Sequence, residues 1–332
     1  MIIKHNVQLQ PYNSFRTKAL AKIFCEPRTI DELIEVIKTH PEEKKLILGA
    51  GFNLFFTKDF DGLVIKPVME EITTLGEDSE HVEIEAGAGI EWDSLVGRCV
   101  ARGYAGIENL SLIPSSVGAC PVQNIGAYGT EARETITRVT AVDMNSGEAR
   151  IFNNEECQFG YRDSFFKHNA DYAIASVAFR LNKSFSYKEK YVDLSRELNG
   201  VASPTLAQVR EAVIRVRNRK LPDYHVLPNA GSFFKNLVLT REEKENLLKV
   251  AVDAPVYNAG ENRFKTSAAF LIDKAGYKGK RRGMVGTYEH HSLVVVNHGT
   301  EDGRDIVAFT REIQEEVKKQ FGVMLEPEVQ VY

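Results

Sequence analysis

The stretch from Ile113 to Gly129 reads Ile-Pro-Ser-Ser-Val-Gly-Ala-Cys-Pro-Val-Gln-Asn-Ile-Gly-Ala-Tyr-Gly. It is apolar, yet it holds too many Pro, Gly, Ser and Asn residues for an ordinary helix or strand. Its glycines permit close approaches that a Cβ would forbid, and its prolines fix φ and remove backbone donors. A buried, irregular backbone needs hydrogen-bond partners, which a large polar cofactor lying along it would supply. Composition alone also fits a glycine-rich surface loop.

A second glycine-rich segment follows a predicted buried strand at 45–48 and reads Gly49-Ala50-Gly51-Phe52-Asn53. A strand followed by Gly-x-Gly is typical of dinucleotide-binding folds, but Leu54 occupies the place of the third glycine and no well-patterned helix follows. We therefore exclude a Rossmann domain. A tight glycine-rich loop after a strand still offers backbone N–H groups to an anion.

The composition is that of a globular protein with two or three domains: 332 residues, 43% hydrophobic and 27% charged. A net charge of −4 argues against nucleic-acid binding. No apolar run approaches the ~20 residues that span a bilayer, and the N-terminus lacks the apolar core of a signal peptide. We therefore expect a cytoplasmic protein without membrane partners. No disulfide framework or metal site is expected, because the cysteines are scattered: Cys25, Cys99, Cys120 and Cys157.

Hydrophobic periodicity predicts an irregular succession of helices and strands. Helices are expected at 29–39, 91–102, 206–220, 266–275 and 305–321, and strands at 45–48, 62–66, 82–86, 136–144, 172–181 and 293–297. This order is not a repeated βαβ array and favours an α+β fold. Most cations near the end of helix 206–220, Arg215, Arg217 and Arg219, are interpreted as a solvated face that complements the helix dipole.

Four further motifs accompany the two glycine-rich segments: Pro11–Phe15, Phe159–Ser164, Pro228–Asn236 and Leu325–Val329. Together the set resembles the UDP-N-acetylenolpyruvoylglucosamine reductase family, the flavin reductases of peptidoglycan precursor synthesis. The resemblance covers nearly the whole chain, and its motifs are long and ordered. It is far more specific than a lone Gly-x-Gly.

The resemblance implies an α+β fold with a two-part FAD-binding domain of the vanillyl-alcohol-oxidase/PCMH type, followed by a smaller α+β substrate domain. On this basis we expect a first FAD-binding subdomain at 1–67, a second at 68–204 and the substrate domain at 205–332. A substrate-capping loop is expected near 184–200. The last strand, at about 323–332, is expected to pack back toward the flavin.

The resemblance also implies one FAD, bound non-covalently because the first loop has no His for attachment. We expect the FAD pyrophosphate near 49–53 and the flavin ring near 113–128. Phe52 stands where the family usually has Ser, so a hydroxyl contact to phosphate is lost there and backbone donors must carry the binding. Ser115 stands where the family generally has Gly, a departure expected to reshape the phosphate contacts slightly. The expected cofactor-binding residues are Gly49, Ala50, Gly51, Phe52, Asn53, Leu54, Pro114, Ser115, Ser116, Gly118, Ala119, Gln123, Asn124, Gly126, Ala127 and Tyr128.

Three residues match the family's catalytic groups. Arg162 is suited to grip a carboxylate bidentately. Ser232 matches the general acid that protonates the substrate carbon, and Glu326 would polarise the assembly, as a protonated acid if it is buried. Taken singly, Arg162 and Glu326 also fit an ordinary ion pair, and Ser232 fits a turn.

The implied reaction is reduction of UDP-N-acetylglucosamine enolpyruvate to UDP-N-acetylmuramate, with NADPH as electron donor and hydride delivered from flavin N5. Substrate contacts are expected from Tyr191, Lys220, Asn236 and His290, and His291 is an alternative to His290. Both histidines also fit exposed, solvated positions.

Two other functions stay open. One is an FAD-linked oxidase of the same superfamily, and the other is a non-catalytic flavin or nucleotide-sugar sensor. The presence of Ser232, Arg162 and Glu326 counts against the sensor. We expect a monomer.

Overall fold

The computed structural model describes residues 1–187, 191–198, 201 and 203–332. The chain divides into two compact units, each built from more than one stretch of sequence. Unit 1 comprises Met1–Val7, Ala21–Ala50 and Asp61–Arg217, and unit 2 comprises Gln8–Leu20, Gly51–Phe60 and Asn218–Tyr332. Two short N-terminal segments therefore fold with the C-terminal part of the chain.

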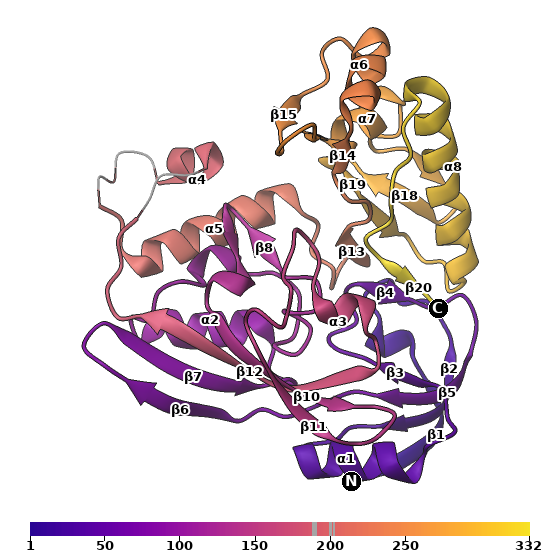
Figure 1. Ribbon diagram of the computed structural model, residues 1–332. Coiled ribbons are helices and arrows are strands. Elements are labelled where there is room, and N and C mark those ends of the chain that lie inside the picture. The colour runs from indigo at the N-terminus through magenta and orange to yellow at the C-terminus, as the bar shows by residue number, and fades with distance from the viewer. Residues whose placement is uncertain (188–190, 199–200, 202) are drawn as a thin grey trace. The chain divides into compact units, whose positions relative to one another are not determined.

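Unit 1 contains two main sheets (Figure 1). The four-stranded sheet has the order β1 (Ile3–Gln8), β2 (Leu20–Cys25), β5 (Phe60–Ile65) and β3 (Lys45–Ile47). The five-stranded antiparallel sheet has the order β11 (Ala149–Asn153), β10 (Ile136–Asp143), β12 (Tyr172–Asn182), β7 (His81–Gly87) and β6 (Ile72–Glu77). A small ribbon pairs β8 (Gly126–Ala127) with β9 (Thr130–Glu131).

Helix α1 (Ile30–Thr39) joins these two sheets into one core. Thr29 caps the helix, because its hydroxyl accepts a hydrogen bond of 3.2 Å from the backbone N–H of Glu32. The buried face of α1 packs in one cluster with residues of β2, β5, β10 and β12, and its members are Leu33, Val36 and Ile37. The apolar face of α1 thus packs against both sheets.

The other helices of unit 1 cover the five-stranded sheet and its loops. Helix α2 (Trp92–Ala101) buries its apolar face against β7, β10 and β12. The short helices are α3 (Phe165–His168) and α4 (Val192–Glu197). The long helix α5 (Leu206–Lys220) packs on α4 through a small cluster around Leu194 and Val213. Arg210 of α5 also reaches α2, where it forms a bidentate ion pair with Asp93 at 2.7 and 2.8 Å.

Unit 2 contains a four-stranded and a three-stranded sheet. The first has the order β13 (Asn229–Ser232), β19 (His291–Asn297), β18 (Val285–Tyr288) and β17 (Arg281–Arg282), and the second β14 (Leu237–Leu239), β16 (Phe264–Thr266) and β15 (Val256–Asn258). Its helices are α6 (Arg241–Val250), α7 (Ala268–Lys274) and α8 (Gly303–Phe321). The strand β20 (Gln330–Val331), at the end of the sequence, pairs in parallel with β4 (Leu54–Phe55).

Helix α8 supplies the largest apolar stripe of unit 2. Asp302 caps its N-terminus by accepting a 2.9 Å hydrogen bond from the backbone N–H of Arg304. Gly322 ends it with a left-handed φ of 72°, which favours glycine. The stripe lies in the core with β18 and β19, and its members include Ile306, Phe309, Ile313, Val317 and Phe321.

The sheets and helices confirm the predicted α+β class. Each predicted helix and strand is present, with ends that agree within two residues. The division at residues 67 and 204 stays a prediction. The two compact units follow a different partition, since Gln8–Leu20 and Gly51–Phe60 pack with the C-terminal part.

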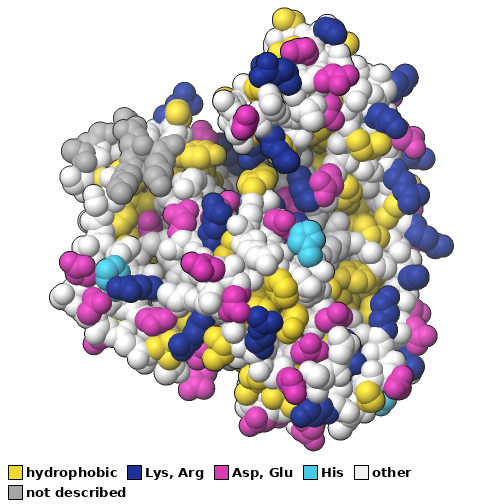
Figure 2. Space-filling view, in the orientation of Figure 1, with side chains coloured by type: hydrophobic (Ala, Val, Ile, Leu, Met, Phe, Trp, Pro, Cys, Tyr) yellow, Lys and Arg dark blue, Asp and Glu magenta, His cyan; other side chains and the backbone are white. Residues whose placement is uncertain are grey.

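The surface carries mixed charge. Figure 2 shows Lys and Arg side chains interspersed with Asp and Glu on one face of the molecule. Among the helices that the structure describes, none is long and apolar enough to cross a membrane.

The stripe of α8 gives a stability prediction. Phe309 is 1% exposed, so Phe309→Ala should lower the free energy of unfolding by about 3–5 kcal/mol. Lys318→Ala, at an exposed site of the same helix, should change it by less than about 0.5 kcal/mol. Urea unfolding followed by far-UV circular dichroism measures both changes. Circular dichroism is preferred to tryptophan fluorescence because the single tryptophan, Trp92, lies in unit 1 and α8 lies in unit 2. Equal losses in the two variants would contradict the packing described for α8.

Candidate active site

The segment Ile113–Gly129 is a built-in part of unit 1 and not a surface loop, because every residue from Ile113 to Tyr128 is buried or half-buried. A Cβ on Gly118 would lie 2.6 Å from the Cβ of Ala88, so this approach requires glycine. Backbone hydrogen bonds fix the segment along residues 88–92: Val117 N–H to Ile90 O (2.9 Å), Gly118 N–H to Ala88 O (2.9 Å) and Trp92 N–H to Ser115 O (3.0 Å).

Gly49 brings the first glycine-rich loop against this segment. A Cβ on Gly49 would lie 3.0 Å from Ser116 Oγ and 3.2 Å from the Cβ of Ala119. Within the part of the chain that the structure describes, the backbone N–H groups of Gly49 and Ala50 have no protein acceptor. Both residues are half-buried. Unused backbone donors beside a serine hydroxyl fit the diphosphate of a dinucleotide.

The rest of the first loop lies in unit 2. Gly51 has a φ of 73°, and a Cβ there would lie 2.0 Å from the carbonyl oxygen of Tyr12. The ring of Phe52 meets Tyr224 edge-on, with 4.5 Å between centroids. Asn53 donates to the carbonyl oxygen of Glu328 at 3.2 Å, and Leu54 is a residue of β4. Asn53 and Leu54 therefore hold the C-terminal tail.

Asn124 links the segment Ile113–Gly129, called the central segment below, to the turn that carries Arg162. It is fully buried, and its Nδ2 donates to the carbonyl oxygen of Gly160 at 2.9 Å and to Glu131 at 3.2 Å. Its Oδ1 accepts from the backbone N–H of Arg133 at 3.0 Å. Both ends of this amide, which sequence reasoning assigned to the cofactor, are thus occupied by protein groups.

Arg162 sits in a strained and well-tied turn. Its φ is 54°, a left-handed conformation that a non-glycine residue rarely adopts. Lys167 Nζ donates to the Arg162 carbonyl oxygen at 2.6 Å, and the Arg162 guanidinium donates to Gly126 O at 2.7 Å. Ser164 Oγ also donates to Val122 O at 2.6 Å. The guanidinium is therefore positioned directly beside the central segment.

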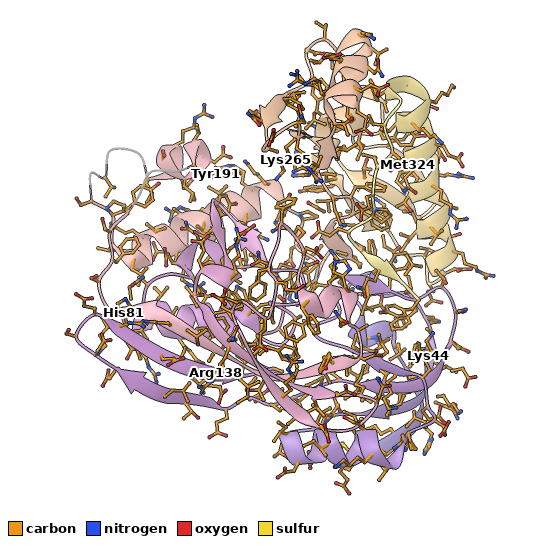
Figure 3. The ribbon with its side chains drawn as sticks, viewed as in Figure 1. Lys44, His81, Arg138, Tyr191, Lys265 and Met324 are labelled. Atoms are coloured by element: carbon orange, nitrogen blue, oxygen red, sulfur yellow. The ribbon has the colours of Figure 1, made fainter. Side chains whose placement is uncertain are left out.

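Tyr128 and Tyr191 are neighbours in unit 1. Their rings meet edge-on at 5.6 Å between centroids, and Tyr191 is 46% exposed at the start of α4 (Figure 3). Within the predicted capping loop, residues 188–190, 199 and 200 lie outside the described residues. The described part brings Tyr191 to the segment that sequence reasoning assigned to the flavin.

Ser232 and Glu326 lie on paired segments of unit 2. Ser232 ends β13, where it is half-buried and opposite Val294 of β19. The C-terminal tail pairs antiparallel with the residues after Ser232, through the hydrogen bonds Lys235 N–H to Glu326 O (2.9 Å) and Glu328 N–H to Phe233 O (2.8 Å). The tail therefore carries Glu326 alongside the segment that begins at Ser232.

Sequence reasoning missed Lys235, which forms an ion pair with the Glu326 carboxylate. The Glu326 side chain is 70% exposed, so the burial required for a protonated carboxyl is not present in this structure. Lys235 stands inside the segment Pro228–Asn236, but sequence alone offered no signal for its partner, which lies far along the chain.

The remaining substrate candidates differ in their surroundings. Asn236 Oδ1 accepts from the backbone N–H of Ala268 at 3.2 Å, at the start of α7. His290 is exposed, pairs with Glu289 at 3.6 Å and meets Tyr288 edge-on. His291 is mostly enclosed, and its Nδ1 is buried with no hydrogen-bond partner. Lys220, at the end of α5, contributes to the electrostatic surroundings of His291.

One interpretation of helix 206–220 is wrong. Arg215 and Arg219 are exposed as predicted, but Arg217 is not part of a solvated face, because its Nε is buried without a hydrogen-bond partner. Charge alone does not tell which cations in the last turn of a helix are exposed and which are buried.

Two family models match the chain. The model described as FAD binding domain matches residues 21–153, and the model described as UDP-N-acetylenolpyruvoylglucosamine reductase, C-terminal domain, matches residues 222–332. The fold and the glycine-rich segments thus define an FAD-binding protein with an added C-terminal domain.

Curated relatives extend this result to the full length. UDP-N-acetylenolpyruvoylglucosamine reductase of Flavobacterium johnsoniae is 40% identical over all of both chains, and that of Chromobacterium violaceum is 42% identical over 97% of each. The crystal structure of the reductase from Thermus caldophilus has a TM-score of 0.72 at 24% identity, covering 100% of this chain and 99% of that one, and confirms the fold. The chain belongs to the UDP-N-acetylenolpyruvoylglucosamine reductase family.

The two neighbouring histidines give a prediction of pH dependence. Burial lowers the pKa of His291 below its ordinary 6.5. The unfolded chain therefore takes up a proton more readily than the folded protein, and this site costs stability as the pH falls below about 6.5. His291→Gln should lose less unfolding free energy than the unmodified protein when the pH is lowered from about 7.5 to about 5.5.

Urea unfolding at several pH values measures the effect. His290→Gln is the matched control, because His290 is exposed, and it should follow the unmodified protein. Identical pH profiles for all three proteins would contradict the burial of His291.

Proposed function

We propose that this protein reduces UDP-N-acetylglucosamine enolpyruvate to UDP-N-acetylmuramate, with FAD as cofactor and NADPH as electron donor, in peptidoglycan precursor synthesis. The observation that carries the proposal is the pairing of the C-terminal tail with the segment after Ser232, in a chain of this family. This pairing places the predicted carboxylate residue, Glu326, opposite Lys235, three residues along the chain from the predicted proton donor Ser232. The oxidase and sensor alternatives gain no support from the comparisons.

The cofactor site suits FAD. The backbone N–H groups of Gly49 and Ala50, which have no acceptor among the described residues, would hold its diphosphate together with Ser116, which lies beside Gly49. The segment Ile113–Tyr128 would line the cofactor. When bound, FAD would supply the hydride-transfer chemistry between NADPH and the enolpyruvyl group. The protein's part is to bind, orient and protonate.

Arg162 would bind the substrate carboxylate. A guanidinium stays charged and offers a planar pair of donors, so it stabilises the negative charge that develops when hydride is added. The ties from Lys167 and Asn124 fix the turn before substrate arrives, which lowers the cost of organising the site.

Ser232 would donate the proton to the substrate carbon. Its hydroxyl makes no hydrogen bond to the described residues, so it is available to a ligand. A serine is a weak acid, but an enolate is a strong enough base to take its proton. Glu326 would orient this group with Lys235 as its counter-ion.

Tyr191, Lys220, Asn236 and His290 are the proposed substrate contacts. His291 joins them as the better-enclosed of the two histidines. We also propose a monomer that acts in the cytoplasm, where UDP-linked sugars and NADPH are found, and a domain division at residues 67 and 204. Size-exclusion chromatography with light scattering tests the monomer.

Acid denaturation tests the cofactor proposal. We expect all yellow colour to pass into the supernatant, because FAD is proposed to be bound non-covalently. Colour that stays with the precipitated protein would overturn this part.

Ser232→Ala separates the two half-reactions. NADPH should still bleach the flavin absorbance, because that step needs no proton donor to carbon. Recovery of the absorbance on addition of the enolpyruvyl nucleotide should slow by about 10²–10⁴-fold, and Ser232→Cys should recover part of the rate. Rapid-mixing absorbance measures both steps.

The control is Ser79→Ala, an exposed serine in the turn between β6 and β7, which should leave both steps unchanged. If Ser232→Ala reoxidises as fast as the unmodified protein, Ser232 is not the acid. If the unmodified protein does not form UDP-N-acetylmuramate at all, the proposed function itself fails.

A further inference from the structure

Arg217 is a cation with no counter-ion among the residues that the structure describes. It lies in the last turn of α5, where the residue is not exposed and Nε is buried with no hydrogen-bond partner. Its neighbours on the helix differ, since Arg215 is exposed and ion-paired with Glu197 at 2.7 Å. Burying an unpaired charged group is costly, so a side chain in this state requires an explanation.

The acidic group that acts on Arg217 is already committed elsewhere. Asp93 contributes to the electrostatic surroundings of Arg217. Its two carboxylate oxygens accept from Arg210 at 2.7 and 2.8 Å, and one also accepts from the backbone N–H of Leu112 at 2.6 Å. Asp93 is thus the counter-ion of Arg210 and makes no direct hydrogen bond to Arg217 within the described part of the chain.

A second guanidinium, that of Arg162, makes the buried positive charge of Arg217 still less favourable. Burial lowers the pKa of Arg217, and the positive charge of Arg162 lowers it further, while Tyr128 and Asp93 act in the opposite direction. Two guanidinium groups therefore influence each other within unit 1. An anion bound near both would neutralise the pair and satisfy the buried donor.

The surroundings indicate which ligand brings that anion. Tyr128 packs against the cluster formed by α4 and α5, and its ring meets Tyr191. Arg162 and Tyr191 are both proposed substrate contacts, so Arg217 is near groups assigned to the substrate. This step rests on the proposed function.

We propose that Arg217 is a second guanidinium of the substrate site and that, with Arg162, it binds an anionic group of the nucleotide-sugar substrate, either the diphosphate or the enolpyruvyl carboxylate. Its Nε–H is held unpaired in the ligand-free protein and is paired by the substrate oxygen. A structural role predicts the opposite, since removal of a structural arginine destabilises the ligand-free protein.

The test compares Arg217→Met, Arg217→Lys and the control Arg215→Met, all as holoenzymes. Calorimetric titration of the oxidised enzyme, without NADPH, gives two dissociation constants: the Kd for UDP and the Kd for the enolpyruvyl nucleotide. Thermal unfolding gives the stability of the holoenzyme without substrate, and visible absorbance gives the FAD content. None of these measurements uses turnover.

We expect Arg217→Met to weaken binding of the enolpyruvyl nucleotide by about 10- to 100-fold, as for loss of a charged hydrogen bond. Its melting temperature should equal or exceed that of the unmodified protein, because an unpaired buried charge is removed. Arg217→Lys should keep part of the affinity, and Arg215→Met should keep all of it. If UDP binding weakens equally, the diphosphate is the anion; if only the enolpyruvyl nucleotide is affected, the anion is the carboxylate.

Unchanged affinity in Arg217→Met would overturn the proposal, as would a loss of FAD with unchanged substrate affinity in the remaining holoenzyme. A lower melting temperature with unchanged affinity would assign Arg217 a structural role. Failure of the unmodified protein to reduce the enolpyruvyl nucleotide would sink the proposed function separately, since the comparison of UDP binding between variants does not depend on catalysis.

Discussion

The structure depends on one constraint: the backbone N–H and C=O groups of an irregular segment in the interior of unit 1 need hydrogen-bond partners. Apart from the two residues of β8, the segment Ile113–Gly129 is neither strand nor helix, so its polar groups must find other partners nearby. Residues 88–92 supply part of them, and the side chain of Asn124 supplies a link to the turn at Gly160. The position of Arg162 follows from this arrangement, because the carbonyl oxygen of Gly126 accepts from its guanidinium. The contacts that give the backbone its hydrogen-bond partners are therefore also the contacts that position Arg162.

Periodic segments were predictable because their signal is local. Helix α8 repeats apolar residues at the helical period between Asp302 and Gly322, and strand β12 is a long run of mostly buried residues. The glycine-rich segments were also found, since Gly118 and Gly51 are glycines for reasons of close approach. The short strand β4 was not predicted, because two residues carry no periodicity. A last strand was expected at about 323–332 only from the resemblance; β20 lies in that range, and its pairing with the distant β4 gives no local signal.

The candidate site was predictable in its residue types and less so in their surroundings. Asn124 stays a predicted cofactor contact, and nothing in the sequence indicated that its amide also links Gly160 and Arg133 within the protein. His290 and His291 are adjacent in sequence and opposite in exposure, which only the strand β19 and its neighbours decide. Arg217 and Arg215 differ in the same way on one helix turn. Burial of a charged side chain depends on what packs against it, and that information is not local.

The parallel pairing of β4 with β20 has a consequence for synthesis on the ribosome. Leu54 leaves the ribosome long before its partner Gln330 is made. Unit 2 therefore cannot fold completely until Gln330 and Val331 have emerged, although Gly51–Phe60 belong to it. During elongation this segment is exposed with its apolar residues Phe55 and Phe56, which are fully buried in the finished protein. A nascent chain of this protein is expected to need shielding of that segment, by the ribosome surface or by a chaperone, until β20 has emerged.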